Sequence, residues 1–182
     1  MGVSLSYSTT DPVPPAAREA IQADARQLNT EREWWSENLI FFRDRKRTEY
    51  LTGDTKVYLN LGDDFVGDDG EEAESVGVDF DDDQFMGVYE ARFIVLTLAR
   101  WSKEHGVSWA VLLAGEEVCR VIAGAVVPPH VFGCGDPPEK ARREDQQAAE
   151  IHARHRGRRI VGRAEPLSWP TDLIENENPG SG

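Results

Sequence analysis

The most regular pattern of apolar residues in the chain begins after residue 82, where they recur at helical spacing. Phe85, Val88, Tyr89 and Phe93 lie one, three or four positions apart, a spacing that gathers side chains on one face of a helix. Further apolar residues flank them on both sides. The pattern therefore predicts a helix from 83 to about 105 that is central and buried on most sides.

Two short runs after this helix have the composition of strands. Residues 107–114 and 118–126 contain several Val, Ile and Trp residues, which favour extended backbone. Gly115 and Glu116 separate the two runs and match a tight turn. We expect a two-stranded hairpin packed on the preceding helix.

The first third of the chain also alternates between strand and helix patterns. Residues 3–8 alternate like a half-buried strand, and the prolines at 14 and 15 suit the first turn of an amphipathic helix that ends near 33–36. Residues 38–43 are apolar on both faces, which predicts a central strand covered on each side. Residues 56–61 are predicted to form the next strand.

The order of these elements is strand, helix, strand, strand, helix, strand, strand. It predicts an α+β protein, a two-layer sandwich in which two helices cover one face of a mainly antiparallel sheet. This is the ferredoxin-like order of strand-helix-strand-strand-helix-strand with an extra C-terminal hairpin strand. A polar helix and a tail follow.

The composition changes after residue 135. A helix at 139–156 follows two prolines and carries few apolar residues, so it can bury little surface. We predict an α+β core domain at 1–135 with an acidic loop at 62–83, a polar basic helix and docking segment at 136–170, and a disordered tail at 171–182.

The formal net charge of −13 limits the kinds of partner. Such a charge repels nucleic-acid backbones and anionic membranes. No stretch of the sequence is long and apolar enough to span a bilayer, and the N-terminus lacks the basic and apolar regions of a signal peptide. We therefore expect a cytoplasmic protein with neither a membrane nor a nucleic acid as its partner.

The most unusual segment runs from Asp63 to Asp83 and is dense in carboxylates, with no lysine or arginine. Such a surface attracts a basic protein partner by charge complementarity and speeds the encounter. The residues predicted to contact this partner are Asp63, Asp64, Asp68, Asp69, Glu71, Glu72 and Glu74.

The same carboxylates would also suit a hard cation, because Ca²⁺ and Mg²⁺ prefer oxygen ligands. The EF-hand spacing is absent, since residues 65–67 break the alternation that follows Asp64, and Gly70 stands where a ligand belongs. The sequence thus predicts no cofactor and leaves a weak Ca²⁺ or Mg²⁺ site as an alternative. A further alternative is that the segment binds nothing and is a solvated loop whose charges repel one another.

The C-terminal segment has the opposite sign of charge. Acidic residues interrupt it and no ladder of aromatic residues accompanies it, so binding to nucleic acid is disfavoured. The segment would instead suit the acidic loop of its own chain or of a second copy, which would give a homo-oligomer. Its basic residues are Lys140, Arg142, Arg143, Arg154, Arg156, Arg158, Arg159 and Arg163.

Four side chains of the types that bind zinc occur late in the chain. They are His130, Cys134, His152 and His155. Structural zinc sites usually contain closely spaced pairs of cysteines, and the spacing here matches no standard pattern. These four residues are weak candidates for a metal site, and loop or solvent-exposed roles are the simpler interpretation.

Motifs for nucleophilic catalysis, for phosphate binding and for dinucleotide binding are absent from the sequence. General acid–base catalysis needs burial that shifts a pKa, and the clustered carboxylates lie in a polar segment. Arg92 and Arg100 lie near the core face of the long helix, where an unpaired charge is costly. They are the candidates for binding a small anionic ligand.

The leading hypothesis is a non-enzymatic acidic interaction domain that binds a basic protein partner, such as an immunity- or antitoxin-type inhibitor. Two alternatives stay open. One is a divalent-metal-binding enzyme that uses the acidic loop. The other is a small-ligand sensor with a pocket beside the long helix.

Overall fold

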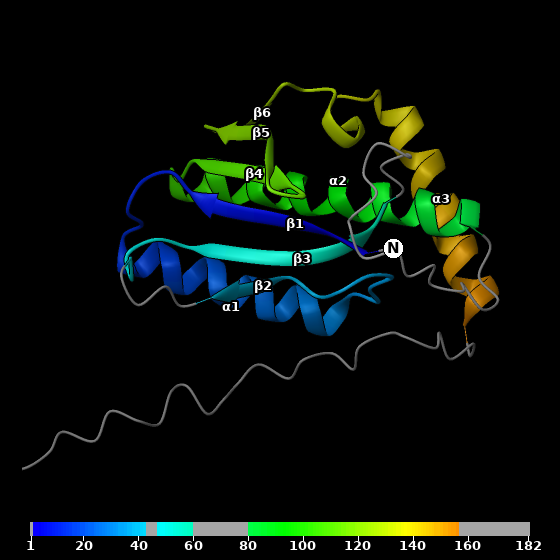
Figure 1. Cartoon of the computed structure of the whole chain (residues 1–182), viewed down its shortest axis with the longest axis horizontal. Coiled ribbons are helices and arrows are strands. Elements are labelled where there is room, and N and C mark those ends of the chain that lie inside the picture. The colour runs from blue at the N-terminus through cyan, green and yellow to red at the C-terminus, as the bar shows by residue number, and fades with distance from the viewer. Residues whose placement is uncertain (1, 43–46, 60–79, 157–182) are drawn as a thin grey trace, which may run out of the picture.

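The computed structural model describes residues 2–42, 47–59 and 80–156, which form an antiparallel sheet of six strands and three α-helices (Figure 1). The predicted α+β class is confirmed. In chain order the elements are β1 (Gly2–Thr9), α1 (Pro15–Glu31), β2 (Ile40–Phe42), β3 (Thr52–Tyr58), α2 (Phe80–His105), β4 (Trp109–Leu113), β5 (Glu116–Ile122), β6 (Ala125–Val127), the short 3₁₀ helix η2 (Val131–Gly133) and α3 (Pro138–His155).

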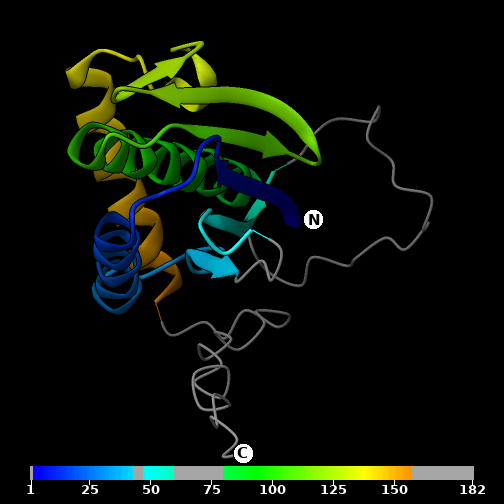
Figure 2. The same ribbon diagram turned by 90° about the vertical axis from the view of Figure 1, so that its left-hand side faces the viewer.

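The strands lie in the order β2-β3-β1-β4-β5-β6, and each neighbouring pair is antiparallel. In the centre, Leu5 of β1 pairs with Thr55 of β3 and with Leu113 of β4. Helices α1 and α2 lie on the same side of the sheet (Figure 2). Inward side chains such as Leu5 are fully buried in one core with Ile21 of α1 and Leu98 of α2.

The prediction of a covered, central strand at 38–43 is wrong. Strand β2 is short and lies at the edge of the sheet, where it pairs only with β3 among the described strands. Its apolar side chains divide between two environments, because Phe41 is buried and Phe42 on the opposite face is 52 % exposed. The hydroxyl of Tyr7 holds this edge in place, since it donates to the carbonyl of Ile40 and accepts from the Ile40 N–H.

Strand β3 begins at Thr52, earlier than the predicted 56–61. The first residues of β3 show no alternation of apolar and polar residues, because the inward positions there are occupied by Gly53 and Thr55. A side chain at 53 would collide with the Tyr7 ring, since an added Cβ would lie 2.2 Å from it. Leu61, the end of the predicted strand, lies outside the described residues.

The single strand predicted at 118–126 is two strands. Chain reversal at Ala123 and Gly124, with φ of 50° and 82°, ends β5 and starts β6. Positive φ at both central residues is the conformation of a tight hairpin turn, which glycine adopts without strain. The preceding turn falls at Ala114 and Gly115, one residue before the predicted position.

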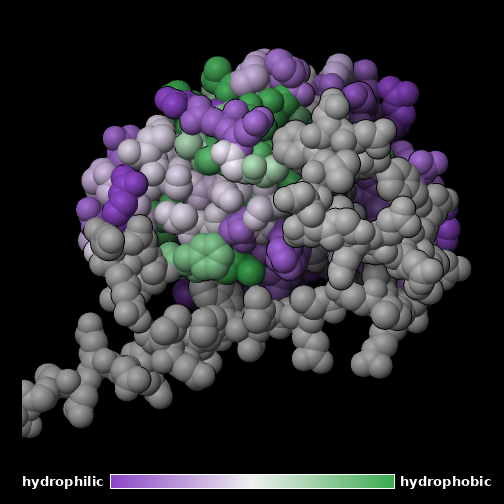
Figure 3. All heavy atoms as spheres, in the orientation of Figure 1, coloured by the Kyte–Doolittle hydropathy of each residue, from purple (hydrophilic) through white to green (hydrophobic). Residues whose placement is uncertain are grey.

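In the described part of the chain, none of the three α-helices lies on the opposite face of the sheet (Figure 2). Ser4 lies on it and donates to the Asp54 carboxylate at 2.7 Å. Figure 3 views this face and shows hydrophobic side chains near its β2 edge and its β5–β6 edge. Large apolar side chains exposed at these edges include Phe42, Ile122 and Val127. Within the described residues, no helix has the length and apolar character needed to cross a membrane.

Candidate functional site

The carboxylates predicted to contact a partner, at positions 63–74, lie outside the described residues. The structure does describe the two ends from which this acidic segment leaves and returns, at Leu59 and at the first turn of α2. Leu59 is 6 % exposed. The backbone of Tyr58 lies so close to Gly87 of α2 that a Cβ on Gly87 would sit 1.6 Å from the Tyr58 oxygen. Both ends therefore belong to packed parts of the protein.

The first turn of α2 carries acidic side chains that contact other elements. Asp82 is 8 % exposed, and its carboxylate lies 2.8 Å from His155 Nε2 and 3.4 Å from Arg154 on α3. Asp83 accepts a hydrogen bond of 2.8 Å from the indole N–H of Trp35. Carboxylates are favourable at this helix end, where the helix dipole is positive. These two acids thus connect α2 to α3 and to the segment after α1.

Trp35 lies at the centre of this region. It is 2 % exposed and follows α1, which ends at Glu31, earlier than the predicted end near 33–36. The rings of His152 and His155 both meet it edge-on, at centroid distances of 5.6 and 5.2 Å. His152 Nδ1 also lies 4.0 Å from Glu33. The helix α3 is therefore positioned on Trp35 by two imidazoles.

Glu90 of α2 is fully buried beneath Trp35. Its carboxylate accepts the backbone N–H of Trp35 and that of Ser36, the latter at 2.7 Å. Burial raises the pKa of Glu90 above the ordinary carboxyl value, and the hydrogen bonds from Ser36 and Trp35 oppose this. Glu90 thus fixes the turn that carries Trp35.

Helix α3 buries three side chains, Ala148, Ile151 and His155, within its described length. Ala148 and Ile151 form a small apolar cluster with Trp35 and Met86, and partly buried Tyr58, Phe85 and Tyr89 pack against it. This cluster is separate from the main core between helices and sheet. The predicted polar helix at 139–156 is confirmed, and the structure shows that it docks on the domain.

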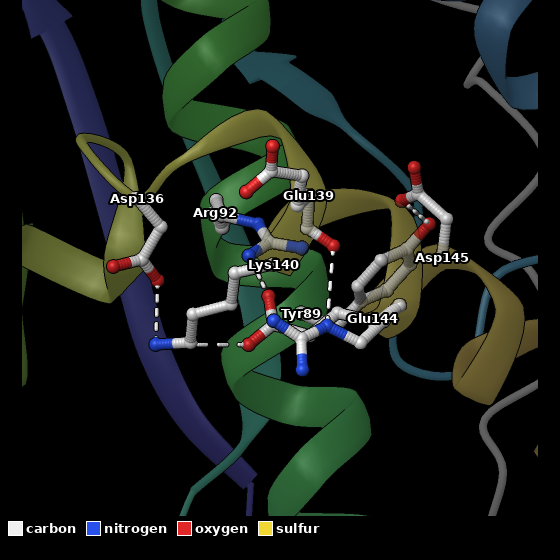
Figure 4. A network of polar contacts seen from close by, with 8 residues as sticks. Tyr89, Arg92, Asp136, Glu139, Lys140, Glu144 and Asp145 are labelled. Atoms are coloured by element: carbon white, nitrogen blue, oxygen red, sulfur yellow. Dashed lines mark hydrogen bonds and ion pairs between the residues drawn. The ribbon is translucent and has the colours of Figure 1, made fainter.

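Polar contacts tie the first half of α3 to α2 (Figure 4). The Arg92 guanidinium pairs with Glu144, and the Tyr89 hydroxyl donates to Asp145 at 3.0 Å. Lys140 Nζ lies 2.8 Å from Asp136 and 3.9 Å from Glu144. Burial, followed by the bond to Asp145, raises the pKa of Tyr89. Each labelled cation in this network faces a carboxylate.

The two candidate arginines, Arg92 and Arg100, form ion pairs with different helices. Arg92 is 7 % exposed and lines a hollow of about 380 Å³ together with Phe85, His130, Phe132 and Lys140. The prediction that Arg100 lies near the core face is wrong, because its side chain is 46 % exposed where it pairs with Asp24 of α1. Arg100 does not line this hollow. Of the two candidate arginines, Arg92 is therefore the one that lines this hollow.

A second hollow, of about 500 Å³, lies among the three helices and is lined by Leu28, Arg32, Tyr89, Phe93, Ala149 and His152. The guanidinium of Arg32 lies over the Phe93 ring, 3.9 Å from its centroid. Apolar and aromatic walls with a charged rim are typical of a binding groove.

The four zinc candidates divide between two elements. His130 and Cys134 flank η2, whereas His152 and His155 lie on α3 against Trp35. Across the described parts of the chain, no three His, Cys, Asp or Glu side chains gather as a metal site would require. Burial raises the pKa of the Cys134 thiol to about 12 and that of Cys119 to about 11. Both thiols are therefore poor nucleophiles at neutral pH.

Sequence reasoning missed the contact of Trp35 with α3, the buried Glu90 and the pairing of Asp82 with His155. A signal for Glu90 existed, because it lies in the apolar stretch between Met86 and Phe93, where an acid must find buried donors. Asp82 and His155 lie far apart in the sequence, so no local sequence pattern predicts that they pair.

In comparisons with known proteins, no family model matches the chain, and no match appears among curated proteins or among solved structures.

Proposed function

We propose that this protein is a non-enzymatic interaction domain that binds a basic protein partner through its acidic segment, as an immunity- or antitoxin-type inhibitor does. The observation that carries the proposal is the run of carboxylates at 63–83, free of lysine and arginine, in a chain of net charge −13. Such a run attracts a basic surface, speeds association and disfavours acidic competitors.

The described residues support this proposal at both ends of the acidic segment. Tyr58 and Leu59 pack against α2 and the core, and Asp82 and Asp83 are held by hydrogen bonds at the other end. A binding segment attached at two fixed points has less conformational freedom to lose when a partner binds than a free tail has. More of the charge attraction is then available for affinity.

The test compares the proteins captured from the natural host by three immobilised full-length chains. The first is the wild type. The second replaces the predicted contact residues by their amides, and it should lose basic proteins that the wild type retains, by about tenfold or more in recovered amount. These residues are Asp63, Asp64, Asp68, Asp69, Glu71, Glu72 and Glu74.

The third chain controls for net charge by neutralising an equal number of exposed acids elsewhere. It should retain the same basic proteins as the wild type. Equal recovery of every captured protein by all three chains would contradict the proposal. The control positions are Glu19, Glu31, Glu49, Glu104, Glu116, Glu139 and Glu150, all of which are exposed.

A second candidate function is favoured by the hollow beside Arg92. Its volume of about 380 Å³ falls within the range of small-molecule sites. A ligand carboxylate would bind there by replacing Glu144 or Asp136 as the partner of Arg92 or Lys140. Here a panel of small carboxylic acids should raise the unfolding temperature of the wild type but not that of Arg92→Met. Equal responses of the two proteins would eliminate this candidate.

We also propose a ferredoxin-like classification for residues 2–113. Support comes from the strand order β2-β3-β1-β4 and from the placement of α1 and α2 on one face. An experimental structure in which β1 does not lie between β3 and β4 would contradict it.

A further inference from the structure

The hollow of about 500 Å³ beside the C-terminal end of α1 is lined by residues of all three helices. Its volume is within the range of sites that bind small molecules. Apolar walls are formed by Leu28 of α1, Phe93 of α2 and Ala148 of α3. The described residues thus form an apolar recess of a size that suits a small ligand.

Arg32 forms a charged wall of this recess, which we call the Arg32 hollow. It directly follows α1, and its backbone N–H donates to the Leu28 carbonyl at 2.9 Å. Its guanidinium lies over three aromatic rings, with centroids at 3.9 Å for Phe93, 5.2 Å for Trp34 and 5.5 Å for Tyr89. Cation–π attraction holds the guanidinium at this place, although a ring face is a weaker acceptor than a carboxylate.

The guanidinium of Arg32 lacks a carboxylate partner. Among the described residues Arg32 forms no ion pair, and its Nε is buried without a hydrogen-bond partner. Burial raises the pKa of Glu90, and the charge of Arg32 is one of the influences that oppose this. Two backbone N–H groups already donate to the Glu90 carboxylate. Because a partly buried charge is costly without a close counter-ion, a ligand carboxylate beside Arg32 would be stabilised.

Acidic groups lie on the side of the Arg32 hollow at the end of α1. Glu31 is the last residue of α1, and the last turn of this helix carries no basic residue. The negative end of a helix dipole favours a cation. Glu33 also lines the hollow, and its side chain is 54 % exposed, with its carboxylate 4.0 Å from His152 Nδ1. A ligand ammonium would therefore be favoured beside Glu33 and the end of α1.

The presence of both signs of charge decides which class of ligand fits the hollow. A ligand with a carboxylate alone would meet Glu31, Glu33 and Asp145, and a ligand with a cation alone would meet Arg32 and Arg156. Like charges brought together in an interface oppose binding. A zwitterion with an apolar body places each of its charges beside the opposite one and avoids both costs.

We propose that the Arg32 hollow binds a free α-amino acid with a large apolar side chain. The ligand carboxylate pairs with Arg32, the ligand ammonium pairs with Glu33 at the end of α1, and the ligand side chain packs against Phe93 and Leu28. This inference goes beyond the proposed function, because it assigns a small-molecule site in which the acidic segment takes no part.

Isothermal titration of the full-length protein with matched ligands tests both charges. L-Phenylalanine should bind, and N-acetyl-L-phenylalanine, which lacks the ammonium, should bind about tenfold or more weakly. L-Phenylalanine amide, which lacks the carboxylate, and L-alanine, which lacks the large side chain, should be weakened to a similar degree. The proposal would be overturned if neither L-phenylalanine nor L-leucine bound at about 10 mM, or if the acetylated or amidated ligand bound as tightly as L-phenylalanine.

Variants of the two charged residues assign each charge of the ligand. Arg32→Gln should lower the affinity for L-phenylalanine about tenfold or more and leave that for the amide unchanged, since the amide has no carboxylate. Glu33→Gln should weaken the binding of L-phenylalanine but not that of its N-acetyl form. Arg26→Gln removes a charge from an exposed position of α1 and should bind like the wild type. An equal effect of Arg32→Gln on L-phenylalanine and its amide, or no effect on either, would overturn the proposal.

A further variant keeps the proposal testable if Arg32→Gln fails to fold. Ala149 is an exposed residue of α3 that lines the hollow, so Ala149→Trp fills the space without changing a charge. It should bind L-phenylalanine about tenfold or more weakly. Gln147→Trp, at an exposed position of α3 outside the lining, should bind like the wild type. Undiminished binding by Ala149→Trp would overturn the proposal.

The outcome of these measurements is independent of the proposed function. None of the variants alters positions 63–74, and none of the ligands is a protein. Binding of an amino acid can therefore fail while partner binding through the acidic segment stands, and the reverse.

Discussion

Glu90 is the side chain on which the geometry around Trp35 depends. It is fully buried, and two consecutive backbone N–H groups, those of Trp35 and Ser36, donate to it. A buried carboxylate is costly unless such donors surround it. The bonds to Glu90 therefore hold the chain after α1 in the path that places Trp35 beneath α3.

Replacing Glu90 by Gln should change the pH dependence of stability. Burial raises the pKa of Glu90 above the ordinary value of 4.5, so the folded protein holds this proton more tightly than the unfolded chain does. Its contribution to stability is then present in full below about pH 4.5 and is lost as the pH rises through the folded pKa. Glu90→Gln lacks this contribution.

Urea unfolding from pH 4.5 to 8 measures the contribution of Glu90 to the free energy of unfolding. The stability of the wild type relative to Glu90→Gln should be greatest at the acidic end, fall with rising pH and then level off. Glu104→Gln, at an exposed position of the same helix, should follow the wild type throughout. A difference between wild type and Glu90→Gln that grows with pH would contradict the assignment.

At the residue scale, the sequence predicts burial better than it predicts partners. The apolar run correctly predicts a buried helix, but Met86, Ile94 and Leu98 form its buried face, whereas the residues of the predicted stripe are only partly buried. The cost of a lone charge correctly marks Arg92 as a residue that must be paired. The identity of its partner, Glu144, depends on how α3 docks. That docking uses few apolar residues, so the hydrophobic pattern carries little information about it.

At the element scale, the errors have a common cause in short strands. Strand β2 reads as central because both of its faces are apolar, yet it is an edge strand that exposes Phe42. Strands β5 and β6 read as one because Ala123 and Gly124 are small residues in an otherwise apolar run. In both cases tertiary pairing decides the outcome, and composition over a few residues does not determine pairing.

The pair of Arg92 and Glu144 should contribute to the docking of α3 on α2. Glu144→Gln leaves the buried Arg92 guanidinium without its charge partner and should destabilise the protein by about 1–3 kcal/mol. The double variant Arg92→Met with Glu144→Gln should recover part of this loss, since no unpaired charge remains. Denaturant unfolding of the four proteins in a double-mutant cycle measures the coupling. Strictly additive losses would show that the pair does not interact.

At the scale of the whole molecule, the distribution of charge is the basis for proposing an interaction domain that binds a basic partner. The net charge of −13 and the run at 63–83 are properties of the sequence alone, and the described residues add that its two ends are anchored. The contact of Asp82 with His155 of α3, and the hydrogen bond that Asp83 accepts from Trp35, are visible only in the fold. Acids at the edge of the run are thus structural, which leaves positions 63–74 as the proposed contacts.

Metal addition distinguishes the interaction domain from the metal-dependent enzyme. An interaction domain of this kind needs no ion, so the unfolding temperature should be the same in EDTA as with excess Ca²⁺, Mg²⁺ or Zn²⁺. A specific site filled at about a hundred times its Kd would stabilise the protein by about 2.7 kcal/mol. Such a stabilisation by Ca²⁺ or Mg²⁺ would favour the enzyme, and one by Zn²⁺ alone would indicate a site formed by His130, Cys134, His152 and His155.

The most direct test of the central claim is the rate at which a captured basic protein associates with the full-length chain as salt increases. The account predicts that the wild type and the control variant associate quickly at low salt and slow steeply as the charges are screened. The variant neutralised at positions 63–74 should associate about tenfold or more slowly at low salt, with little dependence on salt. Identical rates and salt dependence for all three chains would contradict the claim that this protein binds its partner through the acidic segment.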